Sequence, residues 1–511
     1  MADQAGRAIS TVGVVGAGAM GRGIAQVAAV GGYEVILIDS KPGVAEEAKG
    51  FVAKLLARSV EKGRMEQKDA EVVVGRITPA DSLSQLGGCD LVVEAVVEDL
   101  DVKQAIFAEL EGIVRSDCIL ASNTSSLSIA AIAAKAKAPE RIAGFHFFNP
   151  VPLMSLVEVI DGIRTAPWVC ETLMEVGRRM GREPVRVKDA PGFLVNQIGR
   201  GYTIEAAHVV DESIATTEDV DRVMRDLVGF RMGPFELMDL TGLDVTHPAT
   251  EMIHRQFFFE PRYRPSLLMA QRTAAGILGR KSNGGFYLYK DGQPIGRDEP
   301  AAPSALPSSV WISQANPDGA RAIASALGAS GVEVEVGDRP SDSALCLVAP
   351  IGDDATTAAL SENLDPARTV AVETLFAMDR RRVIMPTPAT TAEMLEAAHA
   401  VLAAGGTPVT VLRDSPGFVA QRVVAMIINI CCAIAQSGGA SPDDVDKAPT
   451  LALNYPAGPL SLGDRIGPQK IHQILNALFA TYGDPRYRPS PWLTRRAQLG
   501  LSLKATERMP A

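Results

Sequence analysis

The chain of 511 residues lacks the features that mark several classes of protein. Its six cysteines form no CxxC pair, and no cysteine–histidine group has the spacing of metal ligands, so we expect neither a metal site nor a disulfide framework. Such thiols are typical of the reducing cytoplasm. No uncharged apolar run reaches the ~18 residues of a membrane span. The longest candidate, 423–435, suits a buried core helix, and residues 1–10 lack the apolar core of a signal peptide.

A surplus of basic residues is also absent. The net charge of −10 argues against nucleic acid or an anionic membrane as the main partner. Hydrophobic residues make up 47% and charged residues 22%, which is the balance of a globular protein. The chain is too long for a single hydrophobic core, so we expect about two to four domains.

Short apolar strands alternate with helices in the first part of the chain. The predicted strands are 11–15, 33–38, 89–94, 118–121, 142–147 and 155–160, and the predicted helices are 20–31, 44–62 and 102–113. This alternation predicts a doubly wound, Rossmann-like α/β sheet. From Pro191 to about residue 278 the pattern becomes helical, which predicts an all-α domain.

The helical part then repeats. Asp-Ala-Pro-Gly-Phe at 189–193 returns as Asp-Ser-Pro-Gly-Phe at 414–418, an offset of 225 residues (414 − 189), and Gly233 and Asp239 return at the same offset. Pro-Arg-Tyr-Arg-Pro at 261–265 returns 224 residues later (485 − 261). A near-constant offset predicts a duplicated helical domain.

The stretch between the copies also has α/β character. Residues 332–336, 344–348 and 369–372 are predicted strands, but no glycine-rich loop follows them. We therefore predict four parts. They are a Rossmann-like domain (1–189), a helical domain (190–290), a linker with a degenerate α/β segment (291–412) and a second all-α copy (413–511).

Residues 16–21 read GAGAMG directly after the first strand and open a helix, which is the context that a GxGxxG motif requires. The first glycine allows the tight turn, the second lets the backbone approach a pyrophosphate, and the third lets helix and strand pack closely. The free N–H groups of the helix then face the phosphates. We predict a dinucleotide site formed by Gly16, Ala17, Gly18, Ala19, Met20 and Gly21.

Asp39 follows the second strand, 18 residues after Gly21. A carboxylate there accepts hydrogen bonds from the ribose hydroxyls and repels a 2′-phosphate. The sequence therefore predicts NAD rather than NADP as the cofactor, although the nearby Lys41 weakens this preference. A solvated carboxylate in an ordinary strand–helix turn is the alternative.

Further motifs stand out: NTSS at 123–126, HFFNP at 146–150, PGFLVN at 191–196 and GPFE at 233–236. With the glycine motif, this set resembles the 3-hydroxyacyl-CoA dehydrogenase family over residues 9–290. The two-copy length is similar to the long bacterial form, which includes 3-hydroxyadipyl-CoA dehydrogenases. The resemblance implies an enzyme of fatty acid metabolism and β-oxidation. It would oxidise (3S)-3-hydroxyacyl-CoA to 3-oxoacyl-CoA with NAD, the acyl group being of the 3-hydroxybutyryl or 3-hydroxyadipyl type.

Oxidation of a secondary alcohol requires that a hydride leave carbon 3 and that the hydroxyl lose its proton. His146 suits the second task, because an imidazole titrates near neutral pH. Glu158 ends the Leu-Val-Glu run at 156–158 of a predicted strand, from which its carboxylate can hold one ring nitrogen. The resemblance makes this pair the catalytic dyad. A core histidine and a surface strand charge are the alternatives for the two residues taken singly.

The resemblance assigns three further catalytic positions. It implies that Ser125 and Asn196 hydrogen-bond the hydroxyl and thioester oxygens of the substrate and that Asn149 orders the site. It also places Ser125 among the cofactor contacts. Without the resemblance, a turn or cap is the better interpretation of Ser125, and a helix cap that of Asn196.

Other positions match contacts of the family with its ligands. Glu98 and Lys103 correspond to residues near the nicotinamide ribose, and Lys281 to a late contact with the dinucleotide. Arg58 and Lys62 lie four residues apart on one helix face and match basic positions that contact CoA. A solvated helix face explains these two cations equally well.

The second copy departs from the first. Gln421 stands where the first copy has Asn196, no HFFNP or NTSS segment precedes it, and the stretch 382–388 lacks His and Glu. We predict that this copy has no dehydrogenase site. We hypothesise that it supplies the helical surface that short relatives obtain by dimerising, so that a fragment ending near residue 295 would dimerise or lose solubility.

Two other functions share many of these features. An NAD-dependent dehydrogenase of a free hydroxy acid or sugar acid has the same fold and histidine but needs no CoA. Arg58 and Lys62 favour a CoA substrate over this alternative. A non-catalytic NAD-binding protein keeps the fold without turnover, and the complete set of catalytic residues argues against it. An acyl-CoA is thus the predicted partner, and homo-oligomerisation stays open.

Overall fold

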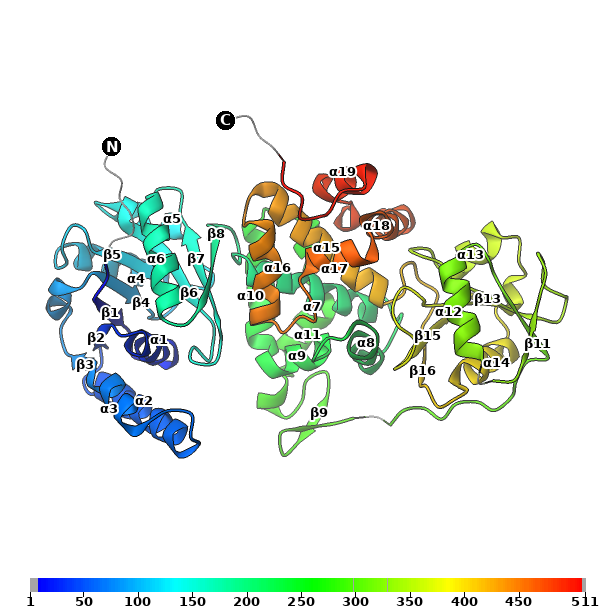
Figure 1. Ribbon diagram of the computed structural model, residues 1–511, viewed down its shortest axis with the longest axis horizontal. Coiled ribbons are helices and arrows are strands. Elements are labelled where there is room, and N and C mark those ends of the chain that lie inside the picture. Colours follow the sequence, from blue (N-terminus) through cyan, green and yellow to red (C-terminus); the bar gives the residue numbers. More distant parts are fainter. Residues whose placement is uncertain (1–7, 297, 329, 508–511) are drawn as a thin grey trace. The chain divides into compact units, whose positions relative to one another are not determined.

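The computed structural model describes residues 8–296, 298–328 and 330–507, and the chain forms two compact units. Unit 1 comprises residues 1–196 and 437–453, and unit 2 comprises residues 197–436 and 454–511. The chain in Figure 1 passes from an α/β part through helices to a second α/β part and back to helices. The predicted order of an α/β domain, a helical domain, a second α/β segment and a second helical copy is confirmed.

Unit 1 is built on an eight-stranded sheet with the strand order β3-β2-β1-β4-β5-β6-β7-β8. Neighbouring strands are parallel, except that β6 and β7 are antiparallel. The strands are β1 (Thr11–Val15), β2 (Glu34–Ile38), β3 (Ile77–Ala80), β4 (Leu91–Glu94), β5 (Ile119–Ser122), β6 (Ile142–Phe147), β7 (Leu156–Asp161) and β8 (Glu183–Lys188). The six predicted strands all form, with ends shifted by at most two residues.

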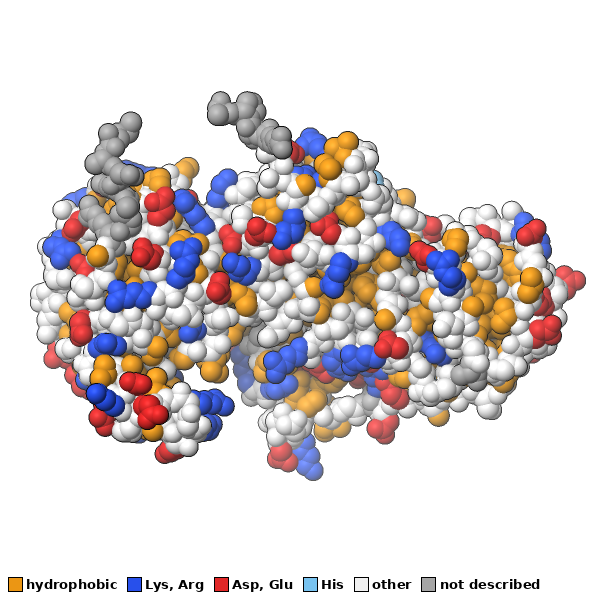
Figure 2. All heavy atoms as spheres, in the orientation of Figure 1, with side chains coloured by type: hydrophobic (Ala, Val, Ile, Leu, Met, Phe, Trp, Pro, Cys, Tyr) orange, Lys and Arg blue, Asp and Glu red, His pale blue; other side chains and the backbone are white. Residues whose placement is uncertain are grey.

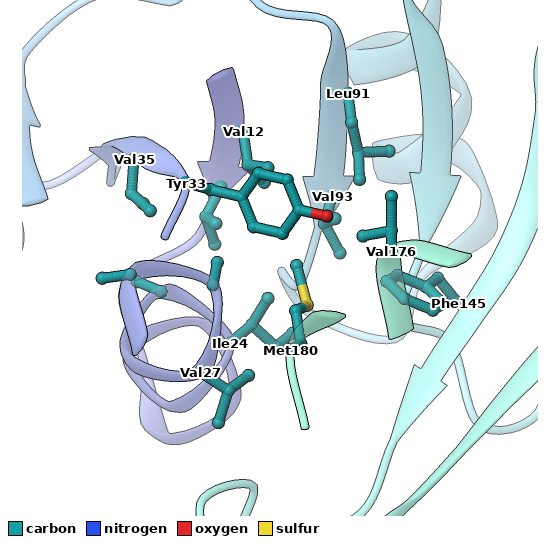
Figure 3. Close-up of a cluster of buried hydrophobic side chains, with 14 of the residues drawn as sticks. Val12, Ile24, Val27, Tyr33, Val35, Leu91, Val93, Phe145, Val176 and Met180 are labelled. Atoms are coloured by element: carbon teal, nitrogen blue, oxygen red, sulfur yellow. The ribbon is translucent and has the colours of Figure 1, made fainter. Parts of the chain in front are cut away.

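Helices cover the sheet of unit 1 (Figure 1). They are α1 (Ala19–Val30), α2 (Val44–Glu61), α3 (Gln67–Gly75), α4 (Leu100–Glu111), α5 (Ile129–Ile132), α6 (Pro167–Arg179) and α16 (Pro442–Ala452). Figure 3 shows Ile24 and Val27 of α1 among core side chains that include Val12 of β1 and Val93 of β4. Each such buried aliphatic side chain stabilises the fold by about 1.5–3 kcal/mol. This packing fixes the start of α1 at the carboxyl end of β1.

Residues 437–453 belong to the second helical copy in sequence but pack in unit 1. Helix α16 lies against β7 and β8. The N–H of Lys188 donates to the carbonyl of Gly439 at 2.8 Å, and Val187 pairs with Ala440 in an antiparallel bridge. This segment therefore covers the free edge of β8, and the predicted domain 413–511 is divided between the two units.

The helical part of unit 2 contains most of both copies. The first copy has α7 (Val195–Asp211), α8 (Thr217–Val223), α9 (Pro234–Thr241), α10 (Leu243–Gln256) and α11 (Leu267–Ala274), and the second has α15 (Ala420–Ser437), α17 (Pro459–Ile466), α18 (Pro468–Tyr482) and α19 (Pro491–Leu499). A hairpin of β9 (Leu288–Lys290) and β10 (Gln293–Ile295) extends into the start of the predicted linker.

The duplication extends to individual contacts. Asp239 accepts hydrogen bonds from the N–H groups of Phe286 and Tyr287, both at 2.9 Å. Asp464, at the matching position, accepts one from the N–H of Leu503 at 2.7 Å. In both copies the carboxylate thus binds the segment that follows the helices, which explains why the repeat retains it.

A buried ionic network joins the two helical copies within unit 2. Glu205 of α7 is 1% exposed and pairs with Arg422 of α15 and, at 2.8 Å, with Arg486. Tyr487 also donates to Glu205, at 2.9 Å. Burial alone would raise the pKa of Glu205, but Arg486 and Arg422 lower it to about 2. The carboxylate is therefore ionised and depends on both arginines.

Helix α15 is long and apolar enough to cross a membrane by length and composition, but 83% of its 18-residue span is buried inside the fold. It is a core helix, as predicted for residues 423–435. On the face of the molecule in Figure 2, Lys and Arg side chains are interspersed with Asp and Glu side chains.

Unit 2 also contains a six-stranded sheet with the order β12-β11-β13-β14-β15-β16. Its strands are β11 (Ser309–Ile312), β12 (Glu333–Glu335), β13 (Leu345–Val348), β14 (Thr369–Val372), β15 (Arg382–Pro386) and β16 (Val409–Val411), and its helices are α12 (Pro317–Leu327), α13 (Ala355–Ser361) and α14 (Ala392–Ala403). The antiparallel pair β14·β15, followed by the parallel β16, repeats the pattern of β6, β7 and β8. This is the predicted degenerate α/β segment, with fewer strands than the first sheet.

Candidate active site

The turn between β1 and α1 requires glycine for steric reasons. Gly16 has a φ of +97°, and a Cβ there would lie 2.6 Å from the carbonyl oxygen of Ala95. A Cβ at Gly21 would lie 1.7 Å from the carbonyl oxygen of Gly16. Glycine at these two positions thus allows the chain to turn tightly and α1 to pack against the turn, as the motif predicts.

A cavity of about 760 Å³ opens at the carboxyl ends of the strands of unit 1. It lies between the parallel strands β1 and β4, where the order in which strands are added to the sheet reverses. This position is the usual ligand site of a doubly wound sheet. Gly18 and Asp39 line it. A Cβ at Gly18 would meet no atom within 4 Å, so its backbone is open to a ligand.

Helix α1 begins beside this cavity with no side-chain cap and no acidic residue in its first turn, so it suits an anion. Asp39 accepts hydrogen bonds from the N–H of Ala17 at 2.9 Å and of Lys41 at 3.0 Å. These bonds fix the carboxylate between the glycine turn and the end of β2. An anion-binding helix end next to a fixed carboxylate fits the pyrophosphate and ribose of a dinucleotide.

The pairing of β6 and β7 brings the two residues of the predicted dyad together. His146 stands opposite Glu158 in this antiparallel pair, and Nδ1 of the ring lies 2.7 Å from Oε2 of the carboxylate. Both residues are buried, at 5% and 0% exposure. A carboxylate can only accept, so the tautomer with its proton on Nδ1 satisfies this contact and leaves Nε2 as an acceptor. This contact fixes the orientation of the imidazole.

Glu158 is itself held by the start of α7. Its Oε1 accepts hydrogen bonds from the N–H groups of Leu194 at 3.1 Å and Val195 at 2.8 Å. The rings of Phe148 and Phe193 flank His146, with centroid distances of 4.5 and 5.8 Å. These contacts leave the ring little freedom to rotate, so the dyad is preorganised.

The segment 123–126 follows β5 and wraps around one carboxylate. Oε1 of Glu98 accepts hydrogen bonds from the Thr124 hydroxyl at 2.6 Å, the N–H groups of Ser125 and Ser126 at 2.9 and 3.0 Å, and the Ser126 hydroxyl at 2.7 Å. Burial opposes ionisation of Glu98, but these bonds and the ammonium of Lys103 hold its pKa below the usual value. Ser125 itself is exposed, and its hydroxyl lies 3.5 Å from Glu98.

The other predicted residues have different surroundings. Asn149 is exposed just after β6, and Asn196 is in the first turn of α7. Arg58 is exposed on α2, and Lys62 is exposed at the end of that helix. Lys281 belongs to unit 2, where its ammonium pairs with Asp244 at 2.5 Å.

Among the described residues, no group of three or more His, Cys, Asp or Glu is placed to hold a metal ion.

The family described as "3-hydroxyacyl-CoA dehydrogenase, NAD binding domain" matches residues 11–190. Its counterpart, "3-hydroxyacyl-CoA dehydrogenase, C-terminal domain", matches residues 192–289 and again residues 417–509. The chain belongs to the 3-hydroxyacyl-CoA dehydrogenase family. It is an NAD-dependent dehydrogenase of 3-hydroxyacyl-CoA, and the second match confirms the duplicated helical domain.

Relatives of this dehydrogenase fall into a long and a short class. It is 37% identical over 500 residues to "3-hydroxyadipyl-CoA dehydrogenase" of Escherichia coli K12, covering 96% of this chain and 98% of that protein. It is 42% identical over 277 residues to "Probable 3-hydroxybutyryl-CoA dehydrogenase" of Deinococcus radiodurans, covering 54% of this chain and 99% of that protein. The short relative thus matches little more than the first half of the chain.

Solved structures show the same two lengths. The structure of 3-hydroxybutyryl-CoA dehydrogenase from Escherichia coli K12 has a TM-score of 0.85 and 35% identity, covering 96% of this chain and 99% of that chain. The structure of (S)-3-hydroxybutyryl-CoA dehydrogenase from Ralstonia eutropha has a TM-score of 0.54 and 39% identity, covering 56% of this chain and 100% of that chain. The fold of the dehydrogenase is therefore that of the family over nearly its whole length.

The second sheet has a carboxylate near the end of the strand that corresponds to β6. Glu373 directly follows β14, and its N–H donates to the carbonyl of Val383 on β15. Gln421, the counterpart of Asn196, donates to Oε1 of Glu373 at 3.0 Å. Strand β15 takes the place of β7, so β14 takes the place of β6. The position that corresponds to His146 therefore lies at the end of β14 and not in the stretch 382–388. A carboxylic acid beside a glutamine does not reproduce the dyad.

Sequence reasoning missed Glu94, which ends β4. Its carboxylate is 0% exposed and pairs with Lys103 at 2.6 Å. An acidic residue that closes a wholly apolar strand (Leu-Val-Val-Glu) is the signal that could have drawn attention to it.

Proposed function

We propose that His146 is the general base that takes the proton of the 3-hydroxyl group, with Glu158 stabilising the imidazolium that results. NAD, when bound, accepts the hydride that leaves carbon 3. The proton goes to Nε2 of His146, because Nδ1 already donates to Glu158. The 2.7 Å contact between the ring and a doubly held carboxylate is the observation that supports this role most.

Two polar groups are proposed to hold the substrate. The hydroxyl of Ser125 and the amide of Asn196 bind the hydroxyl and thioester oxygens of a (3S)-3-hydroxyacyl-CoA, while Asn149 orders the site. The exposure of Ser125 on a segment that Glu98 fixes supports its part in this arrangement. Lys103, Glu98 and Lys281 are proposed to act on the cofactor side.

Arg58 and Lys62 are proposed to bind phosphate groups of CoA. Both side chains are exposed, and their spacing of four residues places them one turn apart at the end of α2. Two cations at this distance suit a phosphate better than one.

The acyl group is proposed to be short, and a dicarboxylic 3-hydroxyadipyl chain is the preferred candidate. A relative named for that substrate is 37% identical over 500 residues and matches 96% of this chain, the same share that is matched by a solved structure named for 3-hydroxybutyryl-CoA. Work in the reducing cytoplasm is also proposed, because all six cysteines are buried thiols with no CxxC or metal-ligand spacing.

The variant His146→Gln tests the proposed base. We expect its kcat with acetoacetyl-CoA and NADH to fall by ~10²–10⁴, while the Kd for NADH, followed by fluorescence, stays unchanged. His399→Gln, on α14 of the second sheet, is the matched control and should keep full activity. A His146→Gln enzyme with nearly normal turnover would remove the dyad from the mechanism.

A substrate panel tests the acyl group. Acetoacetyl-CoA, 3-oxohexanoyl-CoA and 3-oxoadipyl-CoA are compared by the oxidation of NADH. The last two have the same chain length and differ in the distal carboxylate, so a higher kcat/KM for 3-oxoadipyl-CoA supports the dicarboxylic substrate. A preference for 3-oxohexanoyl-CoA or acetoacetyl-CoA would contradict it.

A further inference from the structure

Glu94 is a charged residue in the middle of the first sheet. It ends β4 and stands beside Val15 of β1 and Ser122 of β5, at the carboxyl ends of these strands. Its side chain has no exposure to solvent. A carboxylate in this position loses its hydration, so it persists only where hydrogen bonds and a cation replace the water.

The protein supplies these replacements in full. Oε1 of Glu94 accepts a hydrogen bond from the N–H of Val96 at 2.7 Å and one from the ammonium of Lys103 at 2.6 Å. Oε2 accepts the hydroxyl of Ser122 at 2.6 Å. A buried ion pair of this kind adds little stability compared with apolar side chains of the same volume. What distinguishes it is the set of groups that it fixes.

Both carboxylate oxygens of Glu94 are linked, through other side chains, to residues 124–126. Through Oε1, Glu94 holds Lys103, which is 1% exposed and also lies 3.3 Å from Oε2 of Glu98. Glu98 in turn binds Thr124, Ser125 and Ser126 through its other oxygen.

The second path is shorter. Through Oε2, Glu94 fixes the hydroxyl of Ser122, which accepts a hydrogen bond from the N–H of Thr124 at 3.2 Å. Two independent paths therefore run from one buried carboxylate to residues 124–126, the first through the Lys103–Glu98 ion pair and the second through hydrogen bonds alone.

We propose that Glu94 is a positioning residue of the dehydrogenase, which holds the segment 124–126 so that Ser125 presents its hydroxyl to the substrate. The inference rests on the proposed role of Ser125. Glu94 is fully buried and is not among the residues that line the cavity beside the glycine turn. It acts through Lys103 and Glu98 on one path and through Ser122 on the other, so its loss should loosen the segment without displacing the dyad, which lies on β6 and β7.

The test combines Glu94→Gln with Ser125→Ala. The glutamine amide has the shape of the carboxylate but lacks its charge. Its NH2 group, which donates, replaces one of the two accepting oxygens. We expect each single variant to lower kcat/KM for acetoacetyl-CoA by ~10-fold and the double variant to be no worse than about the poorer single one, because both changes remove the same contact. Effects that multiply to ~100-fold would overturn the proposal.

Hydrogen exchange separates this proposal from the role of Ser125. In Glu94→Gln, the amides of residues 124–126 should exchange faster, whereas those of β7 should not change. Glu171→Gln, an exposed glutamate on α6, is the control and should leave both unchanged. Faster exchange together with a silent Ser125→Ala would refute the role of Ser125 alone, and unchanged exchange would refute the positioning by Glu94.

A second variant keeps the test valid if Glu94→Gln does not fold. Ser122→Ala cuts only the shorter path, so it should give the same changes at a smaller but measurable size. A Ser122→Ala enzyme with the exchange and kinetics of the wild type would also contradict the proposal.

Discussion

Replacing Glu373 by glutamine should make the stability of unit 2 less dependent on pH. Glu373 is 1% exposed. Its Oε1 accepts hydrogen bonds from the N–H of Leu375 at 2.8 Å and from Gln421 at 3.0 Å. Its Oε2 has no partner among the residues that the structure describes. Burial therefore raises the pKa of this carboxyl from 4.5 to about 7.

The sign of the effect follows from this shift. A carboxyl whose pKa is higher in the folded state stabilises the fold fully below its unfolded pKa and loses that contribution as the pH rises towards the folded pKa. Each pKa unit corresponds to about 1.4 kcal/mol. The wild type should therefore lose about 1 kcal/mol by pH 5 and about 3 kcal/mol by pH 8, relative to the protonated form.

Calorimetric melting at pH 5 and pH 8 measures the effect. The amide keeps the shape of the acid and stays neutral, so the advantage of Glu373→Gln over the wild type should grow by about 2 kcal/mol between these pH values. Glu396→Gln, an exposed glutamate on α14, is the control and should show no such growth. An advantage that is the same at both pH values, or that shrinks as the pH rises, would refute the reasoning.

Three further predictions concern charged groups. Asp39→Ser should raise the ratio of kcat/KM for NADP to that for NAD by ~10–100-fold, since it removes a ribose acceptor and its repulsion of a 2′-phosphate. An unchanged ratio in assays with both cofactors would contradict the cofactor site. Arg422→Met should destabilise unit 2 by about 3–5 kcal/mol in guanidinium titrations, because Glu205 keeps only one arginine. Adding Glu205→Gln should recover part of that loss, and a single variant as stable as the wild type would be inconsistent with the network. Arg58→Ala with Lys62→Ala should raise the KM for acetoacetyl-CoA by ~10-fold, unlike Lys68→Ala on α3, and equal KM values would favour a solvated helix face.

The sequence predicted the first sheet well because its signals are local. Apolar runs bounded by turns mark β1 and β6, and the glycine turn has a steric need that no other residue meets. His146 and Glu158 were predicted as a pair by resemblance, and the register of β6 against β7 brings them within 2.7 Å. Here the pattern of residues and the pairing of strands agree.

Other features depend on contacts between distant residues, which spacing does not reveal. Glu94 meets Ser122 only because β4 and β5 are neighbours in the sheet. The correspondence of β14 with β6 follows from the antiparallel pairing with β15, whereas the sequence pointed to the stretch 382–388. The place of α16 in unit 1 is a third case, because its amphipathic pattern predicts a buried face but does not indicate which sheet that face packs against.

That last arrangement has a consequence for biosynthesis. Residues 437–453 complete the edge of β8, so the first sheet remains open on one side until the ribosome has made this segment, long after β8 itself. A nascent chain or a proteolytic fragment that stops before this segment would present an unpaired strand to its neighbours, which invites aggregation. Products of translation that stops before residue 437 are therefore the ones that we expect chaperones and proteases to bind.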